Sequence, residues 1–391
     1  MAEIKVKVLA EDLVLEGDSL ILAEEGLAEV KGKVICEGSC TVKGSLLARD
    51  VRVEGSMYVD GDLSVNDTVE VEGRLQVKGS LNARRVRVDD SCRVEGLIKA
   101  EEVSVGGILD CREIEAGAVK VGGTFRVEKG RACNVNVGGA IEFSQLQANK
   151  VSVGGYLEGG KAKAERLSVG SNVRVDNLEA DNVSVGGSLQ LIEGRLGRVS
   201  VGGTARVGGS LKVSVLSVGG MVKIGGELES EEVTVGGILT IARGGRVNKR
   251  ITVGGTLESR GLLKADELTV GGLTDVEKLV ARIVKVVNLR TAAGVQAEVF
   301  RLSKKGRVEG PVVTKEFVME DGGWAQEVYA KFFECGERCR VQRLYAERAF
   351  IGRGSTVEAV FYVEELKLEE GAKVRKEEKI SEIKPPEGFT L

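Results

Sequence analysis

Apolar residues recur along this chain in pairs spaced by two, and three such pairs return about every 16–18 residues. The most regular part of the pattern is the pentapeptide VSVGG at residues 103–107. If its first residue is position 0, the apolar pairs fall at positions 0 and +2, +6 and +8, and −5 and −3. Residues spaced by two share one face of a β-strand. The pattern therefore predicts three short strands per repeat, each with one apolar face.

The columns of equivalent positions extend over most of the chain. Position −3 is often alanine, which predicts a narrow interior there, and the double glycine predicts a corner where positive φ or close backbone approach favours glycine. Copies of position 0 are Val34, Val51, Val69, Val86, Val103, Val119, Val135, Val151, Leu167, Val183, Val199, Leu216, Val233, Ile251 and Leu268.

A fixed period of this length is typical of solenoids, which grow by adding turns rather than separate cores. We expect an all-β, single-stranded parallel β-helix solenoid of triangular cross-section, with about 16–18 residues per coil and about 22 coils. Parallel crossovers are mostly right-handed. The drifting period also lacks the strict hexapeptide rhythm of left-handed β-helices, so we expect the right hand.

The pattern predicts one continuous β-helix over residues 1–378, less regular over 273–345, and a short tail or cap at 379–391. Residues 324–334, WAQEVYAKFFE, fit both a helical spacing and a strand alternation, so either structure is possible there. Regular coils with glycine corners return at Gly336, Gly354 and Gly371. The tail contains two consecutive prolines, which do not add readily to a sheet.

Composition and charge exclude several classes of function. The net charge is −3, with 56 basic and 59 acidic residues interleaved, so the basic stripe of a nucleic-acid binder is missing. No apolar run approaches the roughly 18 residues of a membrane span. Charges interrupt the first residues, MAEIKVKVLAEDL, so they do not predict a signal peptide. We therefore expect a cytoplasmic protein.

Candidate reactive groups fit structural roles better than catalytic ones. The chain contains no histidine, the commonest general base and metal ligand. Two CxxxC pairs, Cys36 with Cys40 and Cys335 with Cys339, suggest a metal or redox site, but most cysteines occupy columns otherwise held by valine or leucine. We favour buried thiols. We expect no catalytic residue, no metal site, no cofactor and no small-molecule substrate.

Position +1 forms a more specific surface feature. It faces outward on the first strand of each repeat and carries small hydroxyl side chains over a long stretch. Such a column can simply avoid stacking like charges, or it can pack against another molecule. Its candidate residues for a lateral interface are Ser152, Ser168, Ser184, Ser200, Ser217, Thr234, Thr252 and Thr269. We call these eight residues the hydroxyl ladder.

Glycine-cornered coils such as VEGRLQVKGSLNA at residues 71–83 and LKLEEGAKV at 366–374 resemble those of the bactofilins. The resemblance extends from Val34 to about Lys376. Bactofilins are polymer-forming cytoskeletal proteins built on a right-handed β-helix. The resemblance implies assembly end to end, without nucleotide, into non-polar filaments or scaffolds.

The sequence therefore predicts a structural protein, not an enzyme, whose partner is a second copy of itself. Terminal coils of a parallel β-helix leave strand edges unpaired, which independently favours assembly. The alternative is a carbohydrate-binding or carbohydrate-active β-helix. Such proteins usually gather aromatic and charged residues in a groove, whereas aromatic residues make up only 4% of this chain.

Overall fold

The computed structural model describes residues 2–391, and no helix occurs in that range. The strands are β1 (Ala2–Val6), β2 (Val8–Leu9), β3 (Leu13–Leu15), β4 (Ser19–Cys36), β5 (Cys40–Val53), β6 (Met57–Val59), β7 (Leu63–Val65), β8 (Thr68–Val71), β9 (Leu75–Val77), β10 (Leu81–Asn82), β11 (Arg85–Val88), β12 (Cys92–Val105), β13 (Leu109–Val121), β14 (Thr124–Val137), β15 (Ala140–Val153), β16 (Leu157–Val169), β17 (Val173–Val185) and β18 (Ser188–Val201). They continue with β19 (Thr204–Val207), β20 (Leu211–Val218), β21 (Met221–Ile224), β22 (Leu228–Val235), β23 (Ile238–Ile241), β24 (Gly245–Val253), β25 (Thr256–Thr291), β26 (Val295–Met319), β27 (Trp324–Cys335), β28 (Arg340–Ile351), β29 (Thr356–Leu368) and β30 (Lys373–Lys379).

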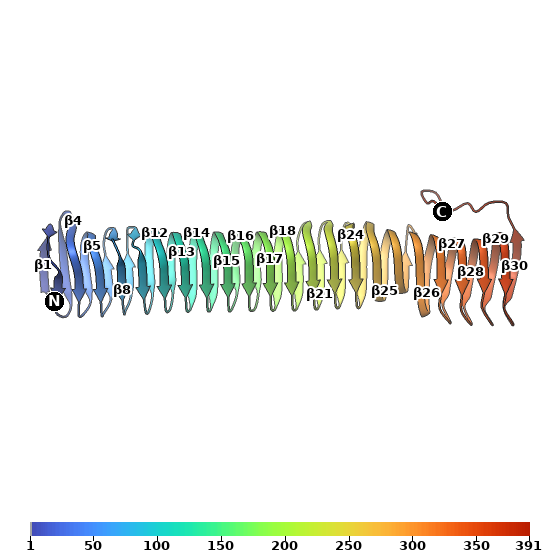
Figure 1. The fold of residues 1–391 in the computed structure, drawn as a ribbon, viewed down its shortest axis with the longest axis horizontal. Coiled ribbons are helices and arrows are strands. Elements are labelled where there is room, and N and C mark those ends of the chain that lie inside the picture. The colour runs from blue at the N-terminus through green and yellow to red at the C-terminus, as the bar shows by residue number, and fades with distance from the viewer. Residues whose placement is uncertain (1) are drawn as a thin grey trace. The chain divides into compact units, whose positions relative to one another are not determined.

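The strands form a parallel β-solenoid, which confirms the predicted fold class. The chain divides into two compact units, Met1–Leu191 and Ile192–Leu391. Within each unit, strands stack turn upon turn (Figure 1). The handedness of the winding stays a prediction.

In the first unit, one turn consists of β6, β7 and β8, and each of these strands has its apolar residues buried on a single face. In later turns the three strands merge across the corners into one long element. The pairing of β12 with β13 then joins all three walls, matching Cys92 to Leu109, Ile98 to Ile114 and Val103 to Val119. These are the columns +6, −5 and 0 of the sequence pattern.

The second unit repeats this arrangement, with Val199 paired to Leu216 and Leu216 paired to Val233. Its interior also holds larger side chains. Three fully buried phenylalanines stack from turn to turn, with ring centroids 4.9 Å apart for Phe300 and Phe317 and 5.5 Å apart for Phe317 and Phe333.

Residues 324–334, whose pattern fitted two structures, lie in strand β27. Both neighbouring turns supply partners, because Val312 pairs with Val328 and Val328 with Leu344. A helix at this place would leave the backbone N–H and C=O groups of β26 and β28 that face it without hydrogen-bond partners. The strand alternation therefore prevails over the helical spacing.

The double-glycine corners arise from close backbone approach rather than from positive φ. A Cβ atom added to Gly139 would lie 2.6 Å from the carbonyl oxygen of Gly123, one turn earlier. No φ between +20° and +160° occurs at this glycine. The alanine column at position −3 is buried at Ala48 and Ala148 but only half-buried at Ala100. The residues of this column lie just before the corner that leads into the strand starting at position 0.

Candidate assembly surfaces

The hydroxyl ladder faces outward and is stacked in register within each unit. In the first unit, Ser152 pairs with Ser168 and Ser168 with Ser184. Both neighbours of Ser168 along the strand, Leu167 and Val169, are buried. Ser168 and Ser184 are exposed, and Ser152 is half-buried.

In the second unit, Ser200 pairs with Ser217, Ser217 with Thr234, Thr234 with Thr252, and Thr252 with Thr269. Ser200, Ser217 and Thr234 are exposed, whereas Thr252 and Thr269 are half-buried. Each unit therefore presents a regular column of small hydroxyls. A binding role for this column stays a prediction.

The other two walls differ in charge from the wall that carries the hydroxyl ladder. On one of them, Lys163 Nζ lies 2.9 Å from Glu179 Oε1 and Lys212 Nζ lies 2.8 Å from Glu229 Oε1. Ion pairs between successive turns therefore occupy the outward positions there. Exposed pairs of this kind contribute little stability each. Their main effect is to keep like charges from stacking.

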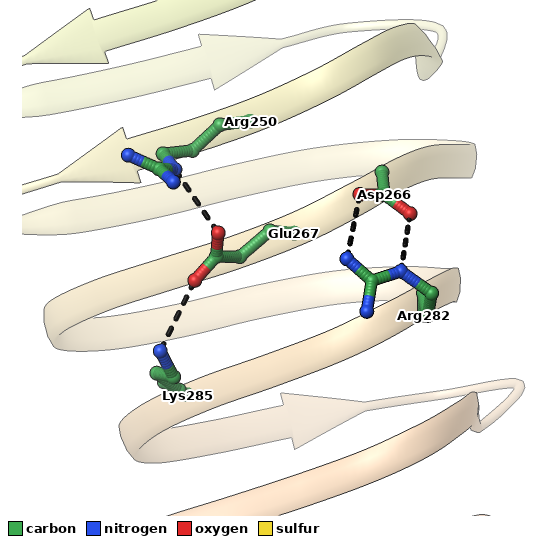
Figure 2. Close-up of polar contacts among 5 residues, drawn as sticks. All are labelled: Arg250, Asp266, Glu267, Arg282 and Lys285. Atoms are coloured by element: carbon green, nitrogen blue, oxygen red, sulfur yellow. Dashed lines mark hydrogen bonds and ion pairs between the residues drawn. The ribbon is translucent and has the colours of Figure 1, made fainter.

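Two carboxylates of β25 form further ion pairs between turns, here next to Leu268 at the edge of the wall that carries the hydroxyl ladder (Figure 2). Glu267 accepts hydrogen bonds from Lys285 at 3.1 Å and from Arg250 at 3.0 Å, on the two adjacent turns. Asp266 accepts two from Arg282, at 2.7 and 2.9 Å. The bond from Lys285, aided by that from Arg250, lowers the pKa of Glu267, and Arg282 lowers the pKa of Asp266. Both groups stay ionised and are poorly suited to donate protons.

A groove of about 430 Å³ lies on the first unit and is a candidate for an enzyme site. Charged side chains line it, among them Arg126 and Glu142. Tyr156 Oη donates to Glu142 at 2.9 Å and Arg126 Nε donates to it at 3.0 Å. These bonds lower the pKa of Glu142, so this carboxyl does not have the raised pKa of a general acid.

The cysteines follow their positions in the repeat. Cys36, Cys40, Cys92, Cys111, Cys335 and Cys339 are buried, and Cys133 is exposed. Burial raises the pKa of Cys92 to about 12. Cys339 Sγ donates to the carbonyl oxygen of Glu320 at 3.2 Å, and the neighbouring Cys335 thiol lowers the pKa of Cys339. No group of three or more potential metal ligands occurs in residues 2–391.

The first turn and the last strand carry different surfaces. Among the described residues, β1, β2 and β3 pair only with β4, and β30 pairs only with β29. The first turn exposes two apolar side chains, Val8 at 56% and Val14 at 57%. Strand β30 has the sequence KVRKEEK and is largely exposed. Charged edge strands resist pairing, whereas apolar ones favour it.

The sequence pattern did not reveal one further surface, where the C-terminal segment lies against the outer face of the last turns. There the outward residues that follow the buried Val312, Val328, Leu344 and Val360 are Val313, Tyr329, Tyr345 and Phe361, whereas earlier turns carry charged residues such as Lys163 and Glu179 in this column. That change of residue type along one column is the signal that was available in the sequence.

Comparison with known proteins supports the resemblance to bactofilins. Residues 7–98 match the family model described as bactofilin, polymer-forming cytoskeletal. Neither the curated proteins nor the solved structures gave a match. A helix long and apolar enough to cross a membrane was not found in the described part of the chain. Over residues 7–98, this β-solenoid is similar to the bactofilins, a family of polymer-forming cytoskeletal proteins.

Proposed function

We propose that this chain is a structural protein that self-assembles in the cytoplasm into nucleotide-independent filaments or scaffolds. The observation that carries the proposal is the match of residues 7–98 to a polymer-forming family. Its role is mechanical, and neither a cofactor nor a small-molecule substrate takes part.

The first turn supports assembly on physical grounds. Strands β1, β2 and β3 pair with β4 on one side, so their opposite edge offers backbone N–H and C=O groups. Pairing this edge with a second copy continues the ladders and covers apolar side chains near it. Such an edge satisfies its backbone groups best by pairing with another strand.

The hydroxyl ladder is proposed as a second, lateral contact. Its side chains are small and uncharged, so contact along this column buries no ionised group of the ladder itself. Ser168→Asp adds a charge to this wall and should separate laterally associated copies without altering the fold. Unchanged lateral association in this variant would show that the hydroxyl ladder is not part of the lateral interface.

Electron microscopy of the purified protein tests the main proposal. We expect elongated assemblies without added nucleotide, and their length should grow with protein concentration. Single particles at every concentration would contradict self-assembly. Saturable binding to a polysaccharide, in a screen of common polymers, would instead favour the carbohydrate-binding alternative.

A further inference from the structure

The last turns of the second unit carry an apolar column on their outer face. Val313 pairs with Tyr329, Tyr329 with Tyr345, and Tyr345 with Phe361, each one turn apart. We call these four residues the aromatic column. The rings of Tyr329 and Tyr345 stack with centroids 4.5 Å apart, and those of Tyr345 and Phe361 are 4.7 Å apart. The equivalent positions of earlier turns carry charged side chains such as Lys163 and Glu179.

The first two residues of the column are nevertheless shielded from water, and Tyr345 and Phe361 are half-buried. Val313 is 0% exposed and Tyr329 is 7% exposed, because Ile383 packs against both. The covering residues belong to segment 380–391, which we call the strap. Figure 1 shows the strap leaving β30 and running back alongside the last turns. Ile380, Phe389 and Leu391 join the same apolar cluster.

The far end of the strap is held at defined points. Gln296 Nε2 donates to Thr390 Oγ1 at 3.0 Å, and Lys278 Nζ lies 4.7 Å from the centre of the Phe389 ring. The Phe389 ring also lies against Gly294, where an added Cβ would come within 2.7 Å of it. The strap is therefore held by specific side-chain contacts on several turns of the solenoid.

The strap is attached mainly through side chains. Within the described residues, one backbone–backbone hydrogen bond joins it to the solenoid, from Ile380 N to Tyr362 O at 2.8 Å. A second, from Phe389 N to Pro386 O, lies inside the strap itself. Pro385 and Pro386 lack N–H groups, so the segment between these bonds cannot form a regular ladder. Its removal should therefore leave the strand ladders of the solenoid intact.

We propose that the strap is exchangeable, so that residues 380–391 of one copy bind the aromatic column of a second copy and join the two side by side. The occupant of the column is known, since the structure places this segment on it. Every copy carries one strap and one column, and exchange between copies therefore preserves each contact. An extended segment of twelve residues spans about 40 Å, which allows it to reach a neighbouring chain. This inference does not depend on end-to-end assembly.

Peptide binding tests the docking site directly. The probe is a fluorescent peptide of residues 380–391, and the acceptor is the chain ending at Lys379. We expect saturable one-to-one binding by fluorescence anisotropy. The full chain should bind the peptide at least tenfold more weakly, because its own strap occupies the column. A peptide with Ile383→Ala and Phe389→Ala should lose at least tenfold in affinity, whereas Glu387→Gln, at an exposed position, should bind normally.

Exchange between chains is tested by mixing two variants. The donor is the full chain with Tyr345→Lys, which keeps the strap but disrupts the column, and the acceptor is the strapless chain. Sedimentation should show a complex of the two that neither forms alone. The proposal is overturned if a folded acceptor fails to bind peptide or donor, or if Tyr345→Lys in the acceptor leaves peptide binding unchanged. Loss of the β-sheet circular dichroism signal on truncation also overturns it, because the strap is then an integral part of the fold.

Discussion

Cys133 lies two residues before the buried Val135 and is exposed, whereas Cys92 and Cys111 occupy inward columns and are buried. The same residue type therefore meets water or the core according to its position in the repeat. The reason is the strand period of two, which fixes the direction of each side chain once the register is set. Ser152 and Val153 are neighbours along β15, yet the first is half-buried and the second is 3% exposed.

Substitution of this adjacent pair by the same residue tests the inside–outside assignment. Val153→Asp places a carboxyl between the buried Val137 and Val169 and should lower the free energy of unfolding by about 3 kcal/mol or more. Ser152→Asp should change it by less than about 1 kcal/mol. Denaturant midpoints followed by circular dichroism measure both. Equal losses in the two variants would disprove the assignment.

Glu267 provides a test at acidic pH. Its side chain is 18% exposed and bonds to cations on both adjacent turns, so Glu267→Gln should cost about 1 kcal/mol at neutral pH. The folded state lowers the pKa of this carboxyl below its ordinary value of 4.5. Its stabilising contribution is therefore complete above that value and disappears as the pH falls through the lower folded-state pKa.

The expected measurement is a difference in melting temperature between the natural chain and Glu267→Gln that shrinks on acidification. Glu258→Gln, at an exposed position of the same turn, serves as the matched control and should show a smaller difference at neutral pH. A difference for Glu267→Gln that is independent of pH would rule out the ionised carboxylate as its cause.

At the scale of elements, the strand columns were predictable because every repeat has the same spacing of apolar residues. The corners were predicted at the right place, but the sequence allowed two reasons for their glycines, positive φ or close backbone approach. The structure shows close approach at Gly139. Residues 324–334 became a strand only because β26 and β28 flank them. The strap was not predictable from the repeat period of the apolar residues, since its contacts are remote in sequence. Gln296 and Thr390, for example, are 94 residues apart.

A corner substitution tests the close-approach explanation. The carbonyl of Gly123 that a Cβ on Gly139 would meet also accepts the hydrogen bond from Gly139 N at 3.0 Å. It therefore cannot move aside without breaking the ladder, and Gly139→Ala should cost about 1–3 kcal/mol in unfolding free energy. Gly354 has φ of +65° and its nearest neighbour is a side-chain atom at 3.7 Å, so Gly354→Asn should cost less than about 1 kcal/mol. The reverse order would contradict this explanation.

At the scale of the whole molecule, the family match and the unpaired edge of the first turn coincide in sequence. Residues 7–98 include β2 and β3, which together with β1 pair only with β4 among the described residues. The last strand is instead rich in lysine and glutamate. Because apolar edges favour pairing and charged ones oppose it, we assign the stronger assembly contact to the first turn.

Charges placed beside that edge should weaken assembly while leaving the fold unchanged. Val8→Lys combined with Val14→Lys alters two side chains that are already 56% and 57% exposed, so the unfolding free energy should change by less than about 1 kcal/mol. In a pair of stacked copies these lysines would lose part of their hydration against the outward side chains of the neighbouring turn, and particles should therefore become shorter in electron micrographs. Ile192→Lys, at a side chain that is 55% exposed and remote from the first turn in sequence, is the control and should leave particle length unchanged. Equal shortening by both variants would indicate a general effect of charge, and no shortening by the first would place the assembly contact elsewhere.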